Sequence, residues 1–165
     1  MADPDDSELD AFWDIAREHA GLAGVPVYTG ANPMRSLRPP AWAFGATPEQ
    51  ADDLLALVLG GTKTATSSAH ADYVSAGEEL PAPGMLGIVL DGAGHPRALV
   101  VTTEVRVVAF DHVDAGHARD EGEGDRTLEH WRAVHERFFT EHAAGGFQPD
   151  MPVVLERFRL LHPSA

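Results

Sequence analysis

The strongest constraint on the fold is a pair of β-prone segments separated by a short turn. Residues 85–90 and 97–110 are rich in Val, Leu, Ile and Thr, and the glycines of residues 91–94 favour a turn between them. We therefore predict a β-hairpin with a long second arm. Residues 153–161 alternate in polarity as a further strand does. Together with separate helices, these strands predict an α+β fold, which we expect to form a small mixed or antiparallel β-barrel flanked by helices.

Capping signals place the helices. Ser7 is expected to cap a first helix that ends at Gly21, and Thr47 with Pro48 and Gln50 forms a capping box for a second. Further helices are expected at residues 113–120 and from Thr127 onward, the latter with Leu128, Trp131, Val134 and Phe138 facing the core. Residues 21–45 and 67–84 are expected to be loop and turn.

Composition excludes several classes of protein. The 165 residues suit one domain, and they include no cysteine, which excludes disulfides, cysteine zinc sites, iron–sulfur clusters and thiol nucleophiles. The first ten residues are acidic, and no long apolar run follows them. We therefore expect neither a signal peptide nor a membrane partner, and a cytoplasmic protein.

The charge balance restricts the ligands. With 26 acidic and 12 basic residues, the chain has a formal net charge of −14. Such a surface repels phosphate backbones, so we expect no duplex DNA partner and no long nucleic-acid groove. A small substrate, or RNA contacted only locally, is favoured instead.

Lys63 is the only lysine in the chain, and every other basic residue is arginine. A desolvated lysine can lose its proton and act as a base or nucleophile, which arginine cannot do. The alternative is that compositional drift has left one ordinary surface lysine. The sequence alone does not decide between a functional and an accidental Lys63.

The polar run around Lys63 carries a candidate nucleophile. The run does not fit a phosphate-binding loop, because no glycine directly precedes Lys63 and the segment follows a helix instead of a strand. Lys63 and Thr66 would face opposite sides of a regular strand, so they need a bend between them to cooperate. With that bend, a neutral Lys63 could activate the Thr66 hydroxyl. Alternatively, the threonines of this run are simply strand residues.

An acidic cluster at Glu121, Glu123 and Asp125 has three interpretations: a cation site, a solvated loop, or a general acid or base. For the last, desolvation near an apolar helix would raise the pKa of a member. None of the nine histidines has zinc spacing, so structural or exposed roles are expected, although His117 could share a helix face with Glu121. Trp131 is expected in the core, or alternatively as a base-stacking platform.

These residues resemble the ASCH-domain family, whose fold is similar to the PUA-type RNA-binding β-barrel. Residues 61–66 match the family motif G-x-K-x-x-T, and residues 117–121 match its second, acidic motif. Phe44-Gly45, the acidic loop and Glu156-Arg157-Phe158 resemble the longer bacterial branch. The resemblance implies an N-terminal extension over residues 1–41 and an ASCH domain over residues 42–161.

The resemblance also implies chemistry. Small bacterial members of the family include amidohydrolases that deacetylate N4-acetylcytidine with a lysine, a threonine and a glutamate, and these positions fall on Lys63, Thr66 and Glu121. We expect the amide of an N4-acylated cytidine as substrate, with no metal or other cofactor. Lys63 would deprotonate Thr66 for attack on the acyl carbonyl, and Glu121 would give a proton to the departing cytosine amine and later activate water. Substrate contacts are expected from four residues in this sequence: Phe44, Ser68, Glu123 and Trp131.

Two other hypotheses remain at this point. The chain could be an RNA endonuclease in which Lys63 stays charged and stabilises the transition state, with the acidic cluster recruiting a divalent cation. It could also be a non-catalytic reader of RNA or modified bases, whose affinity would fall with salt.

Overall fold

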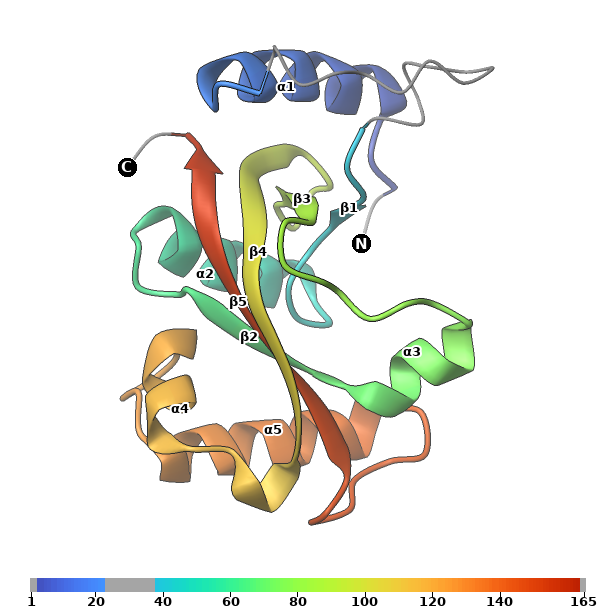
Figure 1. The fold of residues 1–165 in the computed structure, drawn as a ribbon, viewed down its shortest axis with the longest axis vertical. Coiled ribbons are helices and arrows are strands. Elements are labelled where there is room, and N and C mark those ends of the chain that lie inside the picture. Colours follow the sequence, from blue (N-terminus) through green and yellow to red (C-terminus); the bar gives the residue numbers. More distant parts are fainter. Residues whose placement is uncertain (1–2, 23–37, 164–165) are drawn as a thin grey trace. The chain divides into compact units, whose positions relative to one another are not determined.

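The computed structural model describes residues 3–22 and 38–163. Most of the loop expected at residues 21–45, namely residues 23–37, lies outside the described residues. The helices and strands, labelled in Figure 1, are α1 (Asp6–His19), β1 (Ala41–Trp42), α2 (Pro48–Leu59), β2 (Ala65–Ala69), α3 (His70–Ala76), β3 (Leu86–Leu90), β4 (Pro96–Ala109), α4 (Ala115–Glu121), α5 (Leu128–His142) and β5 (Pro152–His162). A 3₁₀ turn (Phe110–His112) lies between β4 and α4.

The strands form one mixed sheet in the order β1-β3-β4-β5-β2. The predicted hairpin is confirmed, because β3 and β4 pair antiparallel with Ile88 opposite Leu99. β1 pairs in parallel with β3, whereas β2 pairs antiparallel with β5. The α+β class is thus confirmed. The expected barrel is not closed, because β1 and β2 are edge strands of the described sheet.

The chain divides into two compact units, of which the first comprises residues 1–60, 86–101 and 160–165. In this unit α1 buries Leu9 and Ala16 in one cluster with Ile88, Leu90 and Leu99. The first helix therefore shares a core with β3 and β4. The boundary expected between residues 41 and 42 stays a prediction.

The caps of this first unit are partly as predicted. Asp5, and not Ser7, caps α1, because its carboxylate accepts backbone N–H bonds from Ser7 at 2.8 Å and Glu8 at 3.2 Å. Both residues are good capping types, and the sequence pattern could not choose between positions two apart. The Thr47 cap of α2 is confirmed, since its hydroxyl accepts from the backbone N–H of Gln50 at 3.2 Å.

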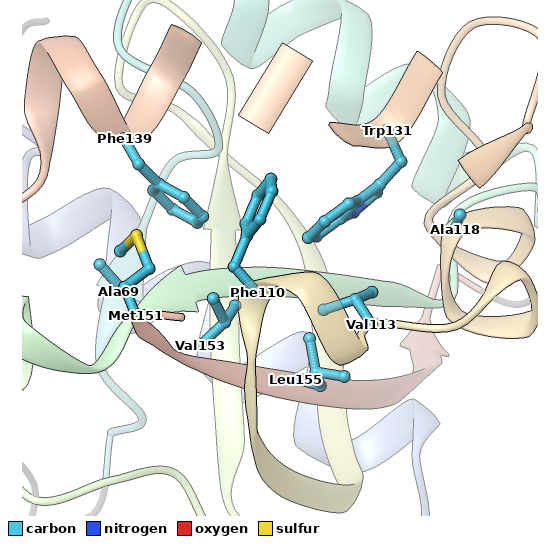
Figure 2. Packing of buried hydrophobic residues seen from close by; sticks show 9 residues of the cluster. All are labelled: Ala69, Phe110, Val113, Ala118, Trp131, Phe139, Met151, Val153 and Leu155. Carbon is cyan, nitrogen blue, oxygen red and sulfur yellow. The ribbon is translucent and has the colours of Figure 1, made fainter. Parts of the chain in front are cut away.

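The second unit comprises residues 61–85 and 102–159. Its core packs Trp131 and Phe139 of α5 above Val153 and Leu155 of β5, with Phe110 between the two α5 rings (Figure 2). In the helix predicted from Thr127, the buried face carries Trp131, His135 and Phe139. Of the other residues expected to face the core, Leu128 and Phe138 are half-buried and pack against this cluster, and Val134 is half-buried.

The polar segment at residues 67–84 is a second correction. It contains the end of β2 and all of α3, although we expected only turn. Small side chains at Ala65 and Ala69 fit a closely packed strand, which hydrophobic patterning does not detect. Within the described residues, no helix is both long enough and apolar enough to span a bilayer.

Candidate active site

The segment before β2 is held between two elements of the second unit. The backbone N–H of Thr64 donates to the carbonyl of Asp120 at the end of α4, at 2.8 Å. The carbonyl of Thr64 accepts from the N–H of Phe158 in β5, at 3.0 Å. These two bonds fix the backbone next to Lys63 against the last turn of α4, which carries Glu121.

Lys63 is buried, with 1% of its side chain exposed. Its Nζ lies 2.7 Å from Oε1 of Glu123 and 3.5 Å from Oε2 of Glu121. An accidental surface lysine is therefore excluded. Lysine is rarely buried to this extent unless it is paired, and here two carboxylates of the acidic cluster pair with it.

Glu121 is the centre of a polar cluster, with 1% of its side chain exposed. Its Oε1 accepts hydrogen bonds from the indole N–H of Trp131 at 2.7 Å and from the Ser67 hydroxyl, and lies 2.9 Å from Nε2 of His117. Its Oε2 lies 3.4 Å from Nε2 of His135. The shared helix face of His117 and Glu121 is thus confirmed.

This environment decides the charge of Glu121. Burial alone would raise the pKa of this carboxyl, but the neighbouring His135 and Lys63 charges and the His117 hydrogen bond outweigh burial and hold its pKa well below the ordinary value. Glu121 in turn raises the pKa of His135 against the opposing effect of burial. The expected upward pKa shift is therefore wrong for Glu121, because its counter-ions come from segments distant in sequence. Glu121 is held as an anion.

Thr66 and Ser67 face opposite sides of β2, as alternation along an extended strand requires. Ser67 lies on the side of Glu121, and its Oγ is 2.9 Å from Nε2 of His117. Thr66 is the cross-strand partner of Glu156 in β5. β2 is regular from Ala65 to Ala69, so the bend that would bring Thr66 to the Lys63 side does not lie within this strand. The nucleophilic role of Thr66 stays a prediction.

The other expected substrate contacts are dispersed. Ser68 lies on the Thr66 side of β2, where its hydroxyl partly offsets the burial that raises the pKa of Tyr73. Trp131 is 3% exposed, and its ring stacks on His135 with centroids 4.3 Å apart, as a core residue does. Phe44 lies in the first unit, where its ring packs edge-on against Trp42. Glu123 contacts Lys63 directly. Substrate binding by these four residues stays a prediction.

Sequence reasoning missed Ser67 and His135 as members of the cluster, and it placed His117 only on the helix face of Glu121. Ser67 could have been found, because positions 63, 65 and 67 share one side of an extended segment. His135 had a weaker signal, four residues after Trp131 on one helix face. The third acid of the cluster, Asp125, instead accepts the backbone N–H of Thr127 at 2.9 Å. Within the described residues, no group of three or more His, Asp or Glu side chains is arranged to hold a metal ion.

Comparison with known proteins agrees with this architecture. The sequence profile of the ASCH domain matches residues 40–162. The chain belongs to the ASCH domain family. It is similar to the crystal structure of protein EF3133 from Enterococcus faecalis V583, at 32% identity and a TM-score of 0.79, over 94% of this chain and 91% of that one.

A second solved structure supports this assignment. The ASCH domain from Lactobacillus crispatus JV V101 is 27% identical, with a TM-score of 0.75 over 93% of this chain and 94% of that one. Among curated proteins, none matches at a significant level. The family, and with it the PUA-like fold, is therefore established for this chain, while the reaction is a separate question.

Gly122 sets the path of the acidic loop in this ASCH domain. It has a φ of 75°, and a Cβ at this position would lie 2.5 Å from the carbonyl oxygen of Thr62. We expect Gly122→Ala to reduce the free energy of unfolding by about 1–3 kcal/mol, measured by urea denaturation. Gly61→Ala is the matched control, because Gly61 has a φ of 76° and nothing within 4 Å. Equal losses in the two variants would show that the contact with Thr62 has no effect.

Proposed function

We propose that this ASCH domain is an amidohydrolase that removes the acyl group from a modified nucleoside of the N4-acetylcytidine type. The observation that carries the proposal is the burial of the only lysine 3.5 Å from a buried carboxylate, with 1% of each side chain exposed. A buried lysine can exchange a proton during a reaction, which arginine cannot do at ordinary pH. The resemblance to N4-acetylcytidine amidohydrolases indicates the substrate class.

The proposed reaction requires the segment before β2 to bring the Lys63 amine to the Thr66 hydroxyl on the other face of the strand. The neutral amine then takes the proton of that hydroxyl, and the Thr66 oxygen attacks the acyl carbonyl. The C–N bond then breaks, the cytosine amine departs with a proton, and the acyl group remains on Thr66 as an ester. Water hydrolyses the ester, and Lys63 returns its proton to the Thr66 oxygen. Thr66 is regenerated, and one amide and one water give one amine and one carboxylic acid.

The carboxylates around Lys63 have supporting roles in this proposal. Glu123 lies 2.7 Å from the amine, a distance at which a carboxylate can accept the proton that Lys63 must lose before the cycle starts. Glu121, held as an anion, stabilises the Lys63 ammonium formed when Thr66 is deprotonated. Because its pKa is lowered, Glu121 is a poor proton donor, and another group must protonate the departing amine.

The test is to incubate the purified protein with N4-acetylcytidine and to quantify cytidine by chromatography. We expect the parent to turn over, and Thr66→Val to lose at least about 100-fold of the rate, since it lacks the attacking oxygen. Thr64→Val is the matched control, because Thr64 is an exposed threonine of the same run. No release by the parent, or equal rates in both variants, would count against the proposal.

The short contact between Lys63 and Glu123 favours a second candidate, single-stranded ribonuclease activity with a permanently charged Lys63. A charged amine could stabilise a phosphorane-like transition state. This candidate predicts cleavage of unstructured RNA, and sensitivity to chelators if a divalent cation takes part. RNA cleavage without release of cytidine from N4-acetylcytidine would favour it over the amidohydrolase.

A further inference from the structure

A second group of polar side chains lies on the face of β2 that carries Thr66, opposite the Glu121 cluster. Glu156 of β5 is the register partner of Thr66, so the two side chains are neighbours on the same face of the sheet. Directly opposed residues in such a pair have Cβ atoms about 4.5–5.5 Å apart. The Cβ atom of a glutamate therefore lies beside that of the proposed nucleophile.

The Glu156 carboxyl is held by β4. The hydroxyl of Thr102, which is 6% exposed, donates to Oε1 of Glu156 at 2.5 Å. Thr102 is fixed in turn by backbone hydrogen bonds with Gly84 and Met85, both at 2.8 Å. Within the described part of the chain, no cation pairs with Glu156. In this respect Glu156 differs from Glu121 and Glu123, which both pair with Lys63.

The surroundings of Glu156 shift its pKa in the opposite direction from the shift at Glu121. Burial raises the pKa of Glu156, and the Thr102 hydrogen bond only partly offsets it. On the α3 side, the titratable group that interacts electrostatically with Glu156 is Tyr73, whose own pKa is raised by burial and, in part, by the Glu156 charge. Two carboxyls whose environments move their pKa values in opposite directions are the pattern that distinguishes an acid from an anionic carboxylate. Glu121 and Glu156 show this pattern from opposite faces of β2.

We propose that Glu156 is the catalytic residue that donates a proton to the departing cytosine amine and then accepts a proton from the hydrolytic water. This inference rests on the proposed amidohydrolase function and replaces Glu121 as the expected proton donor. It uses a carboxyl that is held by Thr102 on the strand that pairs with Thr66, where no cation among residues 3–22 and 38–163 pairs with it.

The proton balance closes with this assignment. When the C–N bond breaks, the nitrogen takes the electron pair of that bond and the proton of Glu156, which becomes a carboxylate. The carboxylate then takes one proton from water while the water oxygen bonds to the acyl carbon. The Thr66 oxygen leaves with the proton stored on Lys63, and Glu156 is again a carboxylic acid.

A substrate whose leaving group needs no proton separates acylation of Thr66 from the later hydrolysis of the acyl ester. p-Nitrophenyl acetate releases p-nitrophenolate, a stable anion, so acylation of Thr66 does not require Glu156. For Glu156→Gln we expect turnover of N4-acetylcytidine to fall at least about 100-fold. The same variant should keep a rapid burst of about one p-nitrophenolate per protein, followed by slow steady-state release, because deacylation lacks its base. Thr66→Val should show no burst.

Glu104→Gln is the matched control, since Glu104 is an exposed glutamate of β4 in the same unit, and it should match the parent with both substrates. If Glu156→Gln hydrolyses N4-acetylcytidine within a few-fold of the parent, the inference falls while the proposed function stands. If a folded Glu156→Gln loses the burst as well, Glu156 has a merely structural role and the inference also falls. If the parent itself is inactive, both fall.

A second variant covers the case in which Glu156→Gln does not fold. Thr102→Val removes the hydrogen bond that lowers the pKa of Glu156, so this pKa should rise further. Activity that requires the protonated acid is lost as pH rises through its pKa. The alkaline limb of the kcat profile for N4-acetylcytidine should therefore move to higher pH in Thr102→Val. An unchanged limb would overturn the inference.

Discussion

Lys63→Arg is expected to reduce the turnover of N4-acetylcytidine by about 10³–10⁴-fold, in the upper part of the range typical for loss of a positioned base. Arginine keeps the positive charge and can still pair with Glu121 and Glu123, but it cannot accept the Thr66 proton. Every step that uses the amine as a proton store is lost together. The measurement is steady-state cytidine release, with folding checked by circular dichroism and thermal unfolding.

The stability of this variant helps to interpret its activity. Arginine is larger than lysine, and at a site that is 2% exposed, overpacking should cost about 1–3 kcal/mol of unfolding free energy. Lys63→Met is the matched control, because it keeps the approximate volume but removes the charge. It should be inactive and should also leave two carboxylates without their partner. If Lys63→Arg retained near-parental turnover, Lys63 would act through its charge and not as a base.

Glu121→Gln is expected to reduce the free energy of unfolding by about 3–5 kcal/mol, as is typical when one partner of a buried ion pair is removed. The carboxylate is 1% exposed, and both Lys63 and His135 lie within 3.5 Å of it. Glutamine has nearly the same shape but no charge, so these two groups would remain in the interior without their counter-ion. Urea denaturation at pH 7 measures the loss.

The pH dependence of stability gives the same prediction a second readout. The lowered pKa of Glu121 contributes stability that is complete above its ordinary value of 4.5 and is lost as pH falls through the folded value. The raised pKa of His135 contributes stability that is complete below its ordinary value of 6.5 and is lost as pH rises through the folded value. The Glu121 and His135 contributions to stability are therefore both complete between pH 4.5 and pH 6.5.

Glu121→Gln should therefore show a flatter profile of stability against pH than the parent on both sides of this window. Glu129→Gln, at an exposed glutamate in the first turn of α5, serves as the matched control and should keep the parental profile. A parental profile in Glu121→Gln would show that the buried pairs do not determine the pH dependence.

Local signals predicted the parts of this fold that depend on local physics. The Asp91–Gly94 turn between two β-prone segments predicted the β3–β4 hairpin, and Thr47 and Thr127 marked the starts of α2 and α5. By contrast, β2 and α3 are polar and short, and they form because β5 supplies a hydrogen-bonding partner along Ala65–Ala69. Such a long-range pairing has no signature in a single segment.

The candidate active site likewise has some features that local sequence signals predicted and others that depend on long-range contacts. The i,i+4 spacing predicted that His117 and Glu121 share a helix face, and the solitary Lys63 indicated a special role before its burial was known. The direction of the Glu121 pKa shift could not be predicted from its neighbours in sequence. It depends on His135, fourteen positions along the chain, and on Lys63, from a different segment. Glu156 likewise becomes a neighbour of Thr66 only through the β2–β5 register.

In the proposed reaction, this ASCH domain uses water to split an acyl amide on a nucleoside. The most direct measurement is mass spectrometry of the products formed from N4-acetylcytidine in ¹⁸O-labelled water by the parent and by Lys63→Arg. We expect equal amounts of cytidine and acetate from the parent, with one solvent oxygen in the acetate, and none above background from the variant. Unchanged N4-acetylcytidine with the parent, or equal product from both proteins, would contradict it.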